Sequence, residues 1–216
     1  MKDTYYHKGM RKKLVQQLKT KGIEDQRVLE AIGAIPRHFF LDNAFEELAY
    51  EDQALPIGQD QTISQPYTVA FQTQLLEVKK GEKILEIGTG SGYQACVLAA
   101  LGAKVYSIER QEALHLRTVE LFQKMGVKNV RCYFGDGYKG LERKAPFDKI
   151  LLTAGATEIP ETLKEQLKIE GKMVVPVGMK TQEMYQITRV SETEFISQVY
   201  GSFRFVPFKE GINKKC

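Results

Sequence analysis

The strongest chemical signal in this 216-residue sequence is the glycine-rich segment EIGTGSGY at positions 86–93. Glycines let a backbone turn sharply and approach a ligand closely, and free N–H groups at the start of a helix favour an anionic group. A dinucleotide fingerprint would read G-x-G-x-x-G, but Tyr93 occupies its sixth position, and the acidic Glu86 lies two residues before the first glycine. The segment predicts a site for a nucleotide-like ligand, although it could also be a plain strand-to-helix turn.

Two more acidic residues follow at intervals that support such a site. Glu109 stands about twenty residues beyond the glycines, where a carboxylate can accept both hydroxyl protons of a ribose and would repel a 2′-phosphate. The alternative is that Glu109 only caps the helix expected near Gln111. Asp136 lies between two glycines and could contact an adenine amino group, whereas Asp-Gly taken alone is usually just a turn.

The elements expected after Lys79 place these residues at one edge of a sheet. Short β-rich runs alternate with helical patterns, which predicts βαβ units and a parallel sheet. The expected strands are 83–87, 104–109, 129–134, 148–153 and 172–177, and the expected crossover helices, each of about three turns, are 91–101, 111–124 and 160–167. EMYQITRV and TEFISQVY predict a late antiparallel hairpin around Ser191. The predicted fold class is α/β, a doubly wound, mainly parallel Rossmann-like sheet with the glycine turn at its binding edge.

The first third of the chain follows a different pattern. Apolar residues at three- and four-residue steps predict helices that end at Pro36. Residues 49–65 lose this periodicity and are too long for a purely connective loop, and Pro66 suits the first turn of a helix that Ser64 or Gln65 would start. We expect residues 1–77 to form a helical segment with a functional loop, and residues 78–216 to form the α/β domain.

Composition and charge argue against several classes of protein. Lys and Arg number 31 against 27 Asp and Glu, and a net charge of +4 gives no argument for a nucleic-acid or membrane partner. No apolar run is long enough to cross a bilayer and the N-terminus has no apolar signal core, so we expect a cytoplasmic protein. Cys96, Cys132 and Cys216 lack C-x-x-C spacing, which predicts neither a disulfide framework nor a bound metal.

The glycine segment resembles motif I of class I methyltransferases, which bind S-adenosylmethionine. The stretch after the fourth expected strand, LTAGA at 152–156, lacks the D/N-P-P-Y of amino-group methyltransferases, which argues against methylation of nitrogen. Neither Ser64 nor Ser91 lies in G-x-S-x-G, so neither is on a hydrolase nucleophile elbow. A strong general base is not evident either. The three histidines of the chain stand outside the motifs. Such a site suits a carboxylate acceptor, which is already deprotonated at neutral pH and needs positioning and partial desolvation more than proton removal.

Most of the chain, from Pro36 to Phe208, resembles the protein-L-isoaspartate O-methyltransferase family. The segments that carry the resemblance are LPIG at 55–58, QTISQP at 61–66, EIGTGSGYQA at 86–95, SIER at 107–110, GDG at 135–137, APFDKI at 145–150, QLKIEGKMVVPVG at 166–178 and RFVP at 204–207. TISQP joined to EIGTGSGYQA is highly specific. The sequence departs from the family at Asp60, where many bacterial relatives have glycine, and at Glu170-Gly171, where Gly-Gly is common.

The resemblance implies a protein repair enzyme, EC 2.1.1.77, that methylates the free α-carboxylate of L-isoaspartyl residues in age-damaged proteins and peptides. S-adenosylmethionine would be the donor and S-adenosylhomocysteine the product, and the ester would close to a succinimide and then yield L-aspartate. Ser64 would be the catalytic residue that orients the carboxylate, and Ser64 and Val206 would contact the substrate. The implied cofactor-binding residues are Thr62, Ile63, Ser64, Glu86, Gly88, Gly90, Glu109, Arg110, Asp136 and Gly137. We expect a monomer.

Other functions remain open at this point. An NAD-dependent oxidoreductase shares the sheet and the ribose acid, but Tyr93 opposes it. An RNA-binding module could use the basic stretch from Arg11 to Lys21, which a solvated helix face also explains. A methyltransferase that acts on another oxygen is the nearest alternative.

Overall fold

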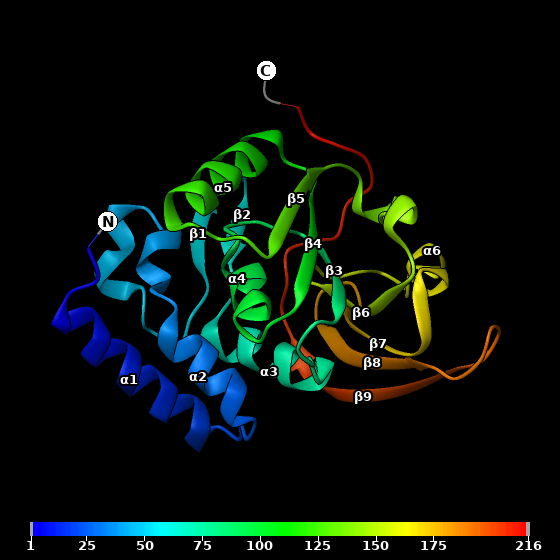
Figure 1. The fold of residues 1–216 in the computed structure, drawn as a ribbon, viewed down its shortest axis with the longest axis horizontal. Helices are drawn as coiled ribbons and strands as arrows, with labels where there is room; N and C mark the ends of the chain where they lie inside the picture. The colour runs from blue at the N-terminus through cyan, green and yellow to red at the C-terminus, as the bar shows by residue number, and fades with distance from the viewer. Residues whose placement is uncertain (1, 215–216) are drawn as a thin grey trace.

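A seven-stranded sheet forms the centre of the computed structural model, which describes residues 2–214 (Figure 1). Its strand order is β5-β4-β3-β6-β7-β8-β9; the first five strands in that order run parallel, and β8 and β9 are antiparallel to their neighbours. The bounds are β3 Lys83–Ile87, β4 Lys104–Glu109, β5 Val130–Phe134, β6 Phe147–Leu152, β7 Leu167–Val177, β8 Gln182–Arg189 and β9 Phe195–Phe203. The predicted α/β class, the mainly parallel sheet and the late hairpin are confirmed.

Six α-helices accompany the sheet in the described part of the chain. They are α1 Tyr5–Thr20, α2 Gln26–Ala34, α3 Pro66–Leu76, α4 Tyr93–Ala100, α5 Glu112–Met125 and α6 Glu161–Glu165, with short 3-10 helices η1 Arg37–Phe40, η2 Asn43–Leu48, η3 Gly137–Lys139 and η4 Glu142–Lys144. The predicted N-terminal helices are confirmed. A helix lies within the predicted range 160–167, but its predicted length of three turns is wrong, because α6 has five residues. Gly155 and Ala156 form isolated β-bridges to Pro207 and Val177, so much of this crossover is extended.

Two apolar clusters cover the two faces of the sheet. Neighbouring strand residues alternate between them, as Ile84 and Leu85 do, because successive side chains point to opposite faces. The larger cluster joins α1 and α2 to α3, α4 and α5, which crowd one side of the sheet in Figure 1. The smaller cluster lies under α6 and the segment of η3 and η4. A continuous core therefore runs from the N-terminal helices into the α/β part.

The expected loop at 49–65 contains a small antiparallel hairpin that the sequence analysis missed. Its strands are β1 Leu55–Gly58 and β2 Gln61–Ile63. Gln59 and Asp60 connect them with φ values of 54° and 55°, and two positive φ values in a row are the geometry of a type I′ turn. The strands have four and three residues, so their alternation is too short to be recognised in the sequence. This hairpin leads directly into Ser64 and α3.

Candidate active site

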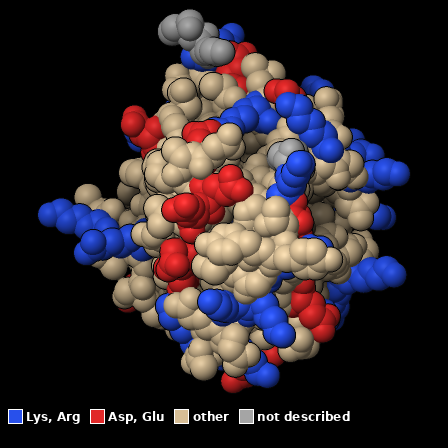
Figure 2. Space-filling model, turned by 90° about the vertical axis from the view of Figure 1, so that its left-hand side faces the viewer, with Lys and Arg blue, Asp and Glu red and all other residues tan. Residues whose placement is uncertain are grey.

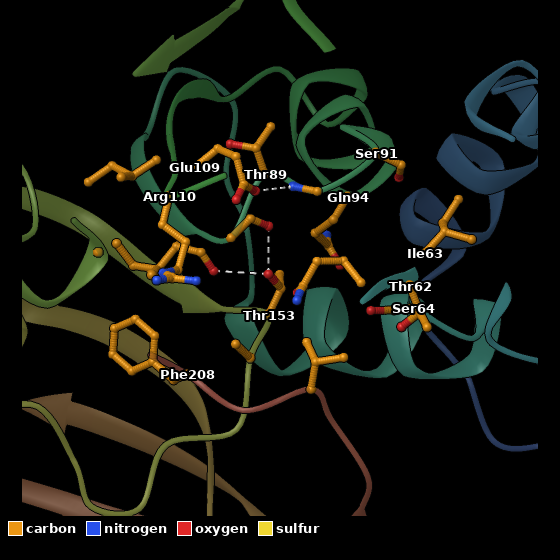
Figure 3. Close-up of a pocket in the computed structure, with 18 of the residues that line it drawn as sticks. Thr62, Ile63, Ser64, Thr89, Ser91, Gln94, Glu109, Arg110, Thr153 and Phe208 are labelled. Carbon is orange, nitrogen blue, oxygen red and sulfur yellow. Dashed lines mark hydrogen bonds between the residues drawn. The ribbon is translucent and has the colours of Figure 1, made fainter. Parts of the chain in front are cut away.

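A pocket opens at the carboxyl ends of β3, β4 and β6, the edge at which open α/β sheets bind ligands (Figure 3). Its empty space is about 820 Å³, part of it open to solvent. The pocket brings together most of the residues predicted from the sequence. These are Thr62, Ile63, Ser64, Gly88, Gly90, Glu109, Arg110, Gly137 and Val206. Glu86 and Asp136 do not line it.

The glycine segment forms the turn between β3 and α4. Gly88, Gly90 and Gly92 have φ values of 97°, 51° and 86°, which side chains rarely adopt. A Cβ atom on Gly88 would lie 2.5 Å from Thr153 Oγ1, and one on Gly92 would lie 2.6 Å from the Phe122 ring. Gly88 therefore lets the turn approach the chain beyond β6, and Gly92 lets the turn pack against α5.

Glu109 serves the pocket and the start of α5 at the same time. Its Oε2 accepts a hydrogen bond from Gly90 N at 2.8 Å, and its Oε1 accepts one from Gln111 N at 2.8 Å. The second bond reaches Gln111, the N-cap residue of α5, and this helix has no side-chain capping bond, so the helix-cap interpretation of Glu109 is wrong. Burial is the main cause that raises the pKa of Glu109. A carboxylate has about four acceptor positions, so two hydrogen bonds leave capacity for ribose hydroxyls.

Glu86 lies beneath the glycine turn and supports it through two hydroxyl groups. Its Oε2 accepts a hydrogen bond from Ser107 Oγ, which is 2.6 Å from Thr89 Oγ1, and Thr89 lines the pocket. Complete burial raises the pKa of Glu86 to about 8. The predicted cofactor residue Glu86 thus reaches the pocket wall through Ser107 and Thr89.

The turn after β5 contributes its glycine to the pocket. Asp136 Oδ1 accepts a hydrogen bond from Tyr138 N at 3.0 Å and so caps η3. A Cβ atom on Gly137 would lie 2.5 Å from Ile87 Cγ2, which leaves room for glycine alone. Phe208 lines the pocket and stacks on Tyr138, with ring centroids 4.0 Å apart and planes within 6°. This corner offers an apolar wall to a flat ring.

Ser64 lies on the far side of the pocket from Arg110 and Phe208 (Figure 3). Of the two residues predicted to start α3, Gln65 is the N-cap, and it makes no side-chain capping bond. Asp52 Oδ1 instead accepts the Tyr67 N–H at 2.7 Å. The Ser64 hydroxyl has no hydrogen bond to any described residue, so the interpretation of Ser64 as a helix-capping serine is wrong.

A groove adjoins the pocket, and Thr62 and Ser64 line both. It has about 1120 Å³ of empty space, part of it open to solvent, between the start of α3 and the segment after β9. Beside it, Val206 O accepts a hydrogen bond from Gly155 N at 2.8 Å. The backbone carbonyl of this predicted substrate residue is therefore already used within the chain.

Some pocket residues were not predicted from the sequence. Thr153 donates its N–H to Ile87 O at 3.0 Å, and its hydroxyl lies 2.7 Å from Gly88 O. Its place directly after a parallel strand was a usable signal. Gln94 donates to Thr73 Oγ1 at 2.9 Å, and its buried Oε1 has no hydrogen-bond partner in the described part of the chain. The other residues that were missed are Gln61, Val69, Ile87, Thr89, Ser91, Tyr93, Ile108, Ala154, Pro207, Phe208 and Lys209.

Among residues 2–214, one group of side chains could in principle hold a metal ion, and none of its members lines the pocket. Asp3, His7 and His38 place potential ligand atoms within 4.8 Å of one another. These atoms already have partners: both Asp3 oxygens accept from Arg11, His7 Nε2 lies 3.0 Å from Glu46 Oε1, and His38 Nδ1 lies 2.6 Å from the Tyr50 hydroxyl. Hydrogen bonding therefore accounts for this cluster.

The cysteines are placed in the core or near it. Cys96 is buried and Cys132 is half-buried, and both are free thiols; Cys216 lies outside the described residues. Burial raises the pKa of both described thiols to about 12, so neither is a ready nucleophile at neutral pH.

The basic stretch of the first helix is mostly a solvated face, as expected, because Lys12, Lys13, Lys19 and Lys21 are exposed. Arg11 is the exception: it is buried, forms an ion pair with Asp3 at 2.9 Å and donates to Gly33 O at 2.8 Å. On the left-hand side of the molecule as drawn in Figure 1, acidic and basic side chains are mixed (Figure 2). No helix within residues 2–214 has the length and apolar character needed to cross a bilayer.

The fold and the site define a class I S-adenosylmethionine-dependent methyltransferase. A family model described as Protein-L-isoaspartate(D-aspartate) O-methyltransferase matches residues 9–213. The chain belongs to this family, and the family predicted from the sequence, its enzyme class and its cofactor are confirmed.

The similarity to known relatives extends along nearly the whole chain. The protein-L-isoaspartate O-methyltransferases of Christiangramia forsetii and Flavobacterium psychrophilum are 57% and 58% identical to it, and each alignment covers 99% of this chain and 100% of the relative. A solved structure of a protein-L-isoaspartate O-methyltransferase matches with a TM-score of 0.85 and 30% identity, covering 94% of this chain and 67% of that one. A second, from Plasmodium falciparum in complex with S-adenosyl-L-homocysteine, has a TM-score of 0.81 and 26% identity, covering 92% and 98%.

Proposed function

We propose that this chain transfers a methyl group from S-adenosylmethionine to the free α-carboxylate of L-isoaspartyl residues, and that Ser64 orients that carboxylate. The observation that carries the proposal is the meeting of the pocket and the groove at Thr62 and Ser64. A donor in the pocket and a peptide in the groove would approach each other there, beside a hydroxyl group that has no partner among the described residues.

The pocket fits an adenosyl donor on three observations. The Glu109 carboxylate faces the glycine turn and keeps acceptor positions for a ribose. Phe208 and Ile108 give an apolar wall for adenine. The α4 N-terminus and the unpartnered Gln94 Oε1 give polar groups for the amino-acid end. When bound, S-adenosylmethionine supplies an activated methyl group on a positively charged sulfur.

The acceptor needs orientation and partial exclusion of water more than a base. A carboxylate is already deprotonated at neutral pH, and no histidine is among the described residues that line the pocket or the groove. The Ser64 O–H can donate to one carboxylate oxygen and leave the other free to attack the methyl group. Thr62 and Ile63 hold this turn against the pocket, and Ile63 is buried.

The product ester accounts for the repair. The next backbone nitrogen attacks the ester carbonyl, and methanol leaves more easily than a carboxylate oxygen would. The resulting succinimide hydrolyses, partly to normal aspartate, without further action of the enzyme.

The setting of the reaction is part of the proposal. Residues 1–77 would serve the acceptor side, and residues 78–216 would serve the donor side and contribute the substrate-contacting segment at Val206. We propose a cytoplasmic monomer that acts on damaged proteins and peptides, with neither nucleic acid nor membrane as a partner. Glu86 and Asp136 would act on the donor through the turns that they support.

Radiolabelled S-adenosylmethionine and matched peptides test this function. Base-labile label should appear on an isoaspartyl peptide and not on its aspartyl twin; base-stable label on either peptide would contradict the proposal. Ser64→Ala should lower kcat about tenfold or more, because a hydrogen bond to a charged group is worth about 1.5–3 kcal/mol. Ser197→Ala, on the exposed face of β9, is the matched control and should leave kcat unchanged. Unchanged turnover of Ser64→Ala at saturating substrate would remove Ser64 from catalysis.

A further inference from the structure

We propose that Arg204 makes the groove selective for isoaspartyl peptides that carry an acidic side chain near the damaged residue. The inference rests on the proposed function, because it takes the acceptor peptide to lie in the groove beside Ser64.

Two segments of the chain form the walls of the groove. It extends from Ser64 along the start of α3, and the segment that follows β9 forms its other wall. Tyr67 and Phe203 line it, and the Phe71 ring braces both, with centroids 5.7 Å from Tyr67 and 5.2 Å from Phe203. Aromatic walls accept many apolar side chains and so give little charge selectivity of their own.

Arg204 supplies the charge of this groove. Among the described residues that line it, Arg204 is the one with a charged side chain. The residue is exposed, and its guanidinium has no hydrogen bond, ion pair or ring contact within residues 2–214. Guanidinium groups pair readily with carboxylates, often through two parallel hydrogen bonds. The free guanidinium of Arg204, in the groove that Ser64 also lines, is available to a carboxylate of the substrate.

Arginines elsewhere in the chain show the contrast. Arg117 pairs with Asp42 at 2.9 Å, and Arg27 pairs with Asp25 at 2.7 Å. Arg189 donates to backbone carbonyls, with Leu167 O at 2.6 Å. These side chains hold parts of the fold together, whereas Arg204 has no such task in the described structure.

Hydrogen bonds hold the backbone on the C-terminal side of Arg204, so its side chain starts from a defined place beside the groove. Phe205 N donates to Gln182 Oε1 at 2.9 Å, and Val206 O accepts from Gly155 N at 2.8 Å. The carboxylate that comes near the groove, Asp52, is already paired with Lys21 at 2.6 Å, and its side chain is 3% exposed. No acidic side chain is among the described residues that line the groove, so none of them competes for Arg204 there.

The test uses a set of short isoaspartyl peptides that differ at one flanking position, which carries Glu, Gln or Lys in turn. kcat/KM is measured for each peptide at low ionic strength, because an exposed pair is screened by salt. The wild-type chain should prefer Glu over Gln about two- to fivefold at one or more positions, as expected for an exposed ion pair. Arg204→Gln should bring that ratio to one, and Arg204→Glu should reverse it in favour of Lys.

Arg143→Gln is the control, because Arg143 is exposed in η4 and lies outside the groove. It should leave the Glu-to-Gln ratio unchanged. Provided that the Gln peptide is methylated, two results would overturn the inference. One is a wild-type Glu-to-Gln ratio of kcat/KM of one or less at every position, and the other is an unchanged preference for Glu in Arg204→Gln. Failure to methylate any isoaspartyl peptide would instead contradict the proposed function.

Discussion

The donor side and the acceptor side of the site are held in place by different means. On the donor side, the glycine turn follows β3 directly, and Gly88 N and Thr89 N both donate to Ile108 O of the neighbouring β4. Adjacent parallel strands and their turns thus form this half of the pocket. On the acceptor side, the hairpin of β1 and β2 forms a separate two-stranded sheet.

Side chains from distant parts of the chain position that hairpin and the segment after β9. Arg117 of α5 donates to Ile57 O at 3.2 Å, Asp52 holds the start of α3, and Gln182 holds Phe205. The geometry of the donor side is therefore set by the central parallel sheet and its turns, whereas the geometry of the acceptor side depends on a few long-range hydrogen bonds. We expect single substitutions to affect the two sides separately.

Gly88→Ala should give the largest effect, and it should act on the donor side. Alanine at a φ of 97° is strained, and its Cβ would lie 2.5 Å from Thr153 Oγ1. The turn is expected to shift to relieve a strain of about 1–3 kcal/mol, and restoring it for binding would lower affinity for S-adenosylhomocysteine about 5- to 150-fold, measured by calorimetry. Gly9→Ala, where the added methyl group meets nothing within 4 Å, should bind as the wild type does. Equal affinity in both variants would contradict the assigned role of the turn.

Asp52→Ala should give the next largest effect, and it should act on the acceptor side. It removes the acceptor of the Tyr67 N–H at the start of α3, and losing a helix cap costs about 0.5–2 kcal/mol. Turnover of isoaspartyl peptide should fall several-fold while affinity for S-adenosylhomocysteine stays nearly constant. Asp52→Asn keeps an acceptor oxygen and should restore most of the turnover. If the two variants are equally impaired, the ion pair with Lys21 matters more than the cap.

The same contrast explains what could be predicted from the sequence. The glycine turn, Glu109 and Gly137 were found because each follows a strand with a clear β pattern, and the carboxyl ends of parallel strands share one edge. The hairpin was missed because its pattern is short, and Asp52 was missed because no spacing relates it to Tyr67, fifteen residues away in the chain. The catalytic role of Ser64 was predicted from the family resemblance, since a serine just before Pro66 by itself indicates a helix cap. Local patterns reveal local geometry, and long-range side-chain contacts leave no such pattern.

Acid should weaken the N-terminal segment through His38. This side chain is buried beside His7, with ring centroids 3.8 Å apart, and burial is the main cause that lowers its pKa. In the unfolded chain His38 takes up a proton near pH 6.5, whereas in the folded chain it does so only at lower pH. Its contribution to the free energy of unfolding should therefore be complete above pH 6.5 and should decrease as the pH falls below that value. Urea unfolding at pH 7.5 and 5.5 measures the difference. His38→Gln should reduce it, and an unchanged pH dependence would rule His38 out.

The smallest effects, on the free energy of unfolding, are expected at Asp60 and Glu170, where the sequence departs from the family pattern. Both residues have a positive φ. Glu170 lies in β7 at a φ of 65°, and Asp60 lies in the hairpin turn at 55°. A left-handed conformation costs an ordinary residue about 1–2 kcal/mol, and glycine relieves it but loses about 0.5–1 kcal/mol of chain entropy. Asp tolerates this conformation better than Glu. Glu170→Gly should therefore stabilise the chain by about 0.5 kcal/mol in urea unfolding, and Asp60→Gly should stabilise it by less.

Glu183→Gly is the matched control, because Glu183 is exposed in β8 and has no positive φ. It should destabilise the chain by about 0.5–1 kcal/mol, the ordinary cost of glycine in a strand. If Glu170→Gly destabilises the chain as much as Glu183→Gly does, the strain at Glu170 is relieved by its surroundings.

Asp60→Gly also sharpens the contrast between the two sides of the site, since its turn leads into Ser64. It should leave affinity for S-adenosylhomocysteine constant even if it alters the KM for the peptide.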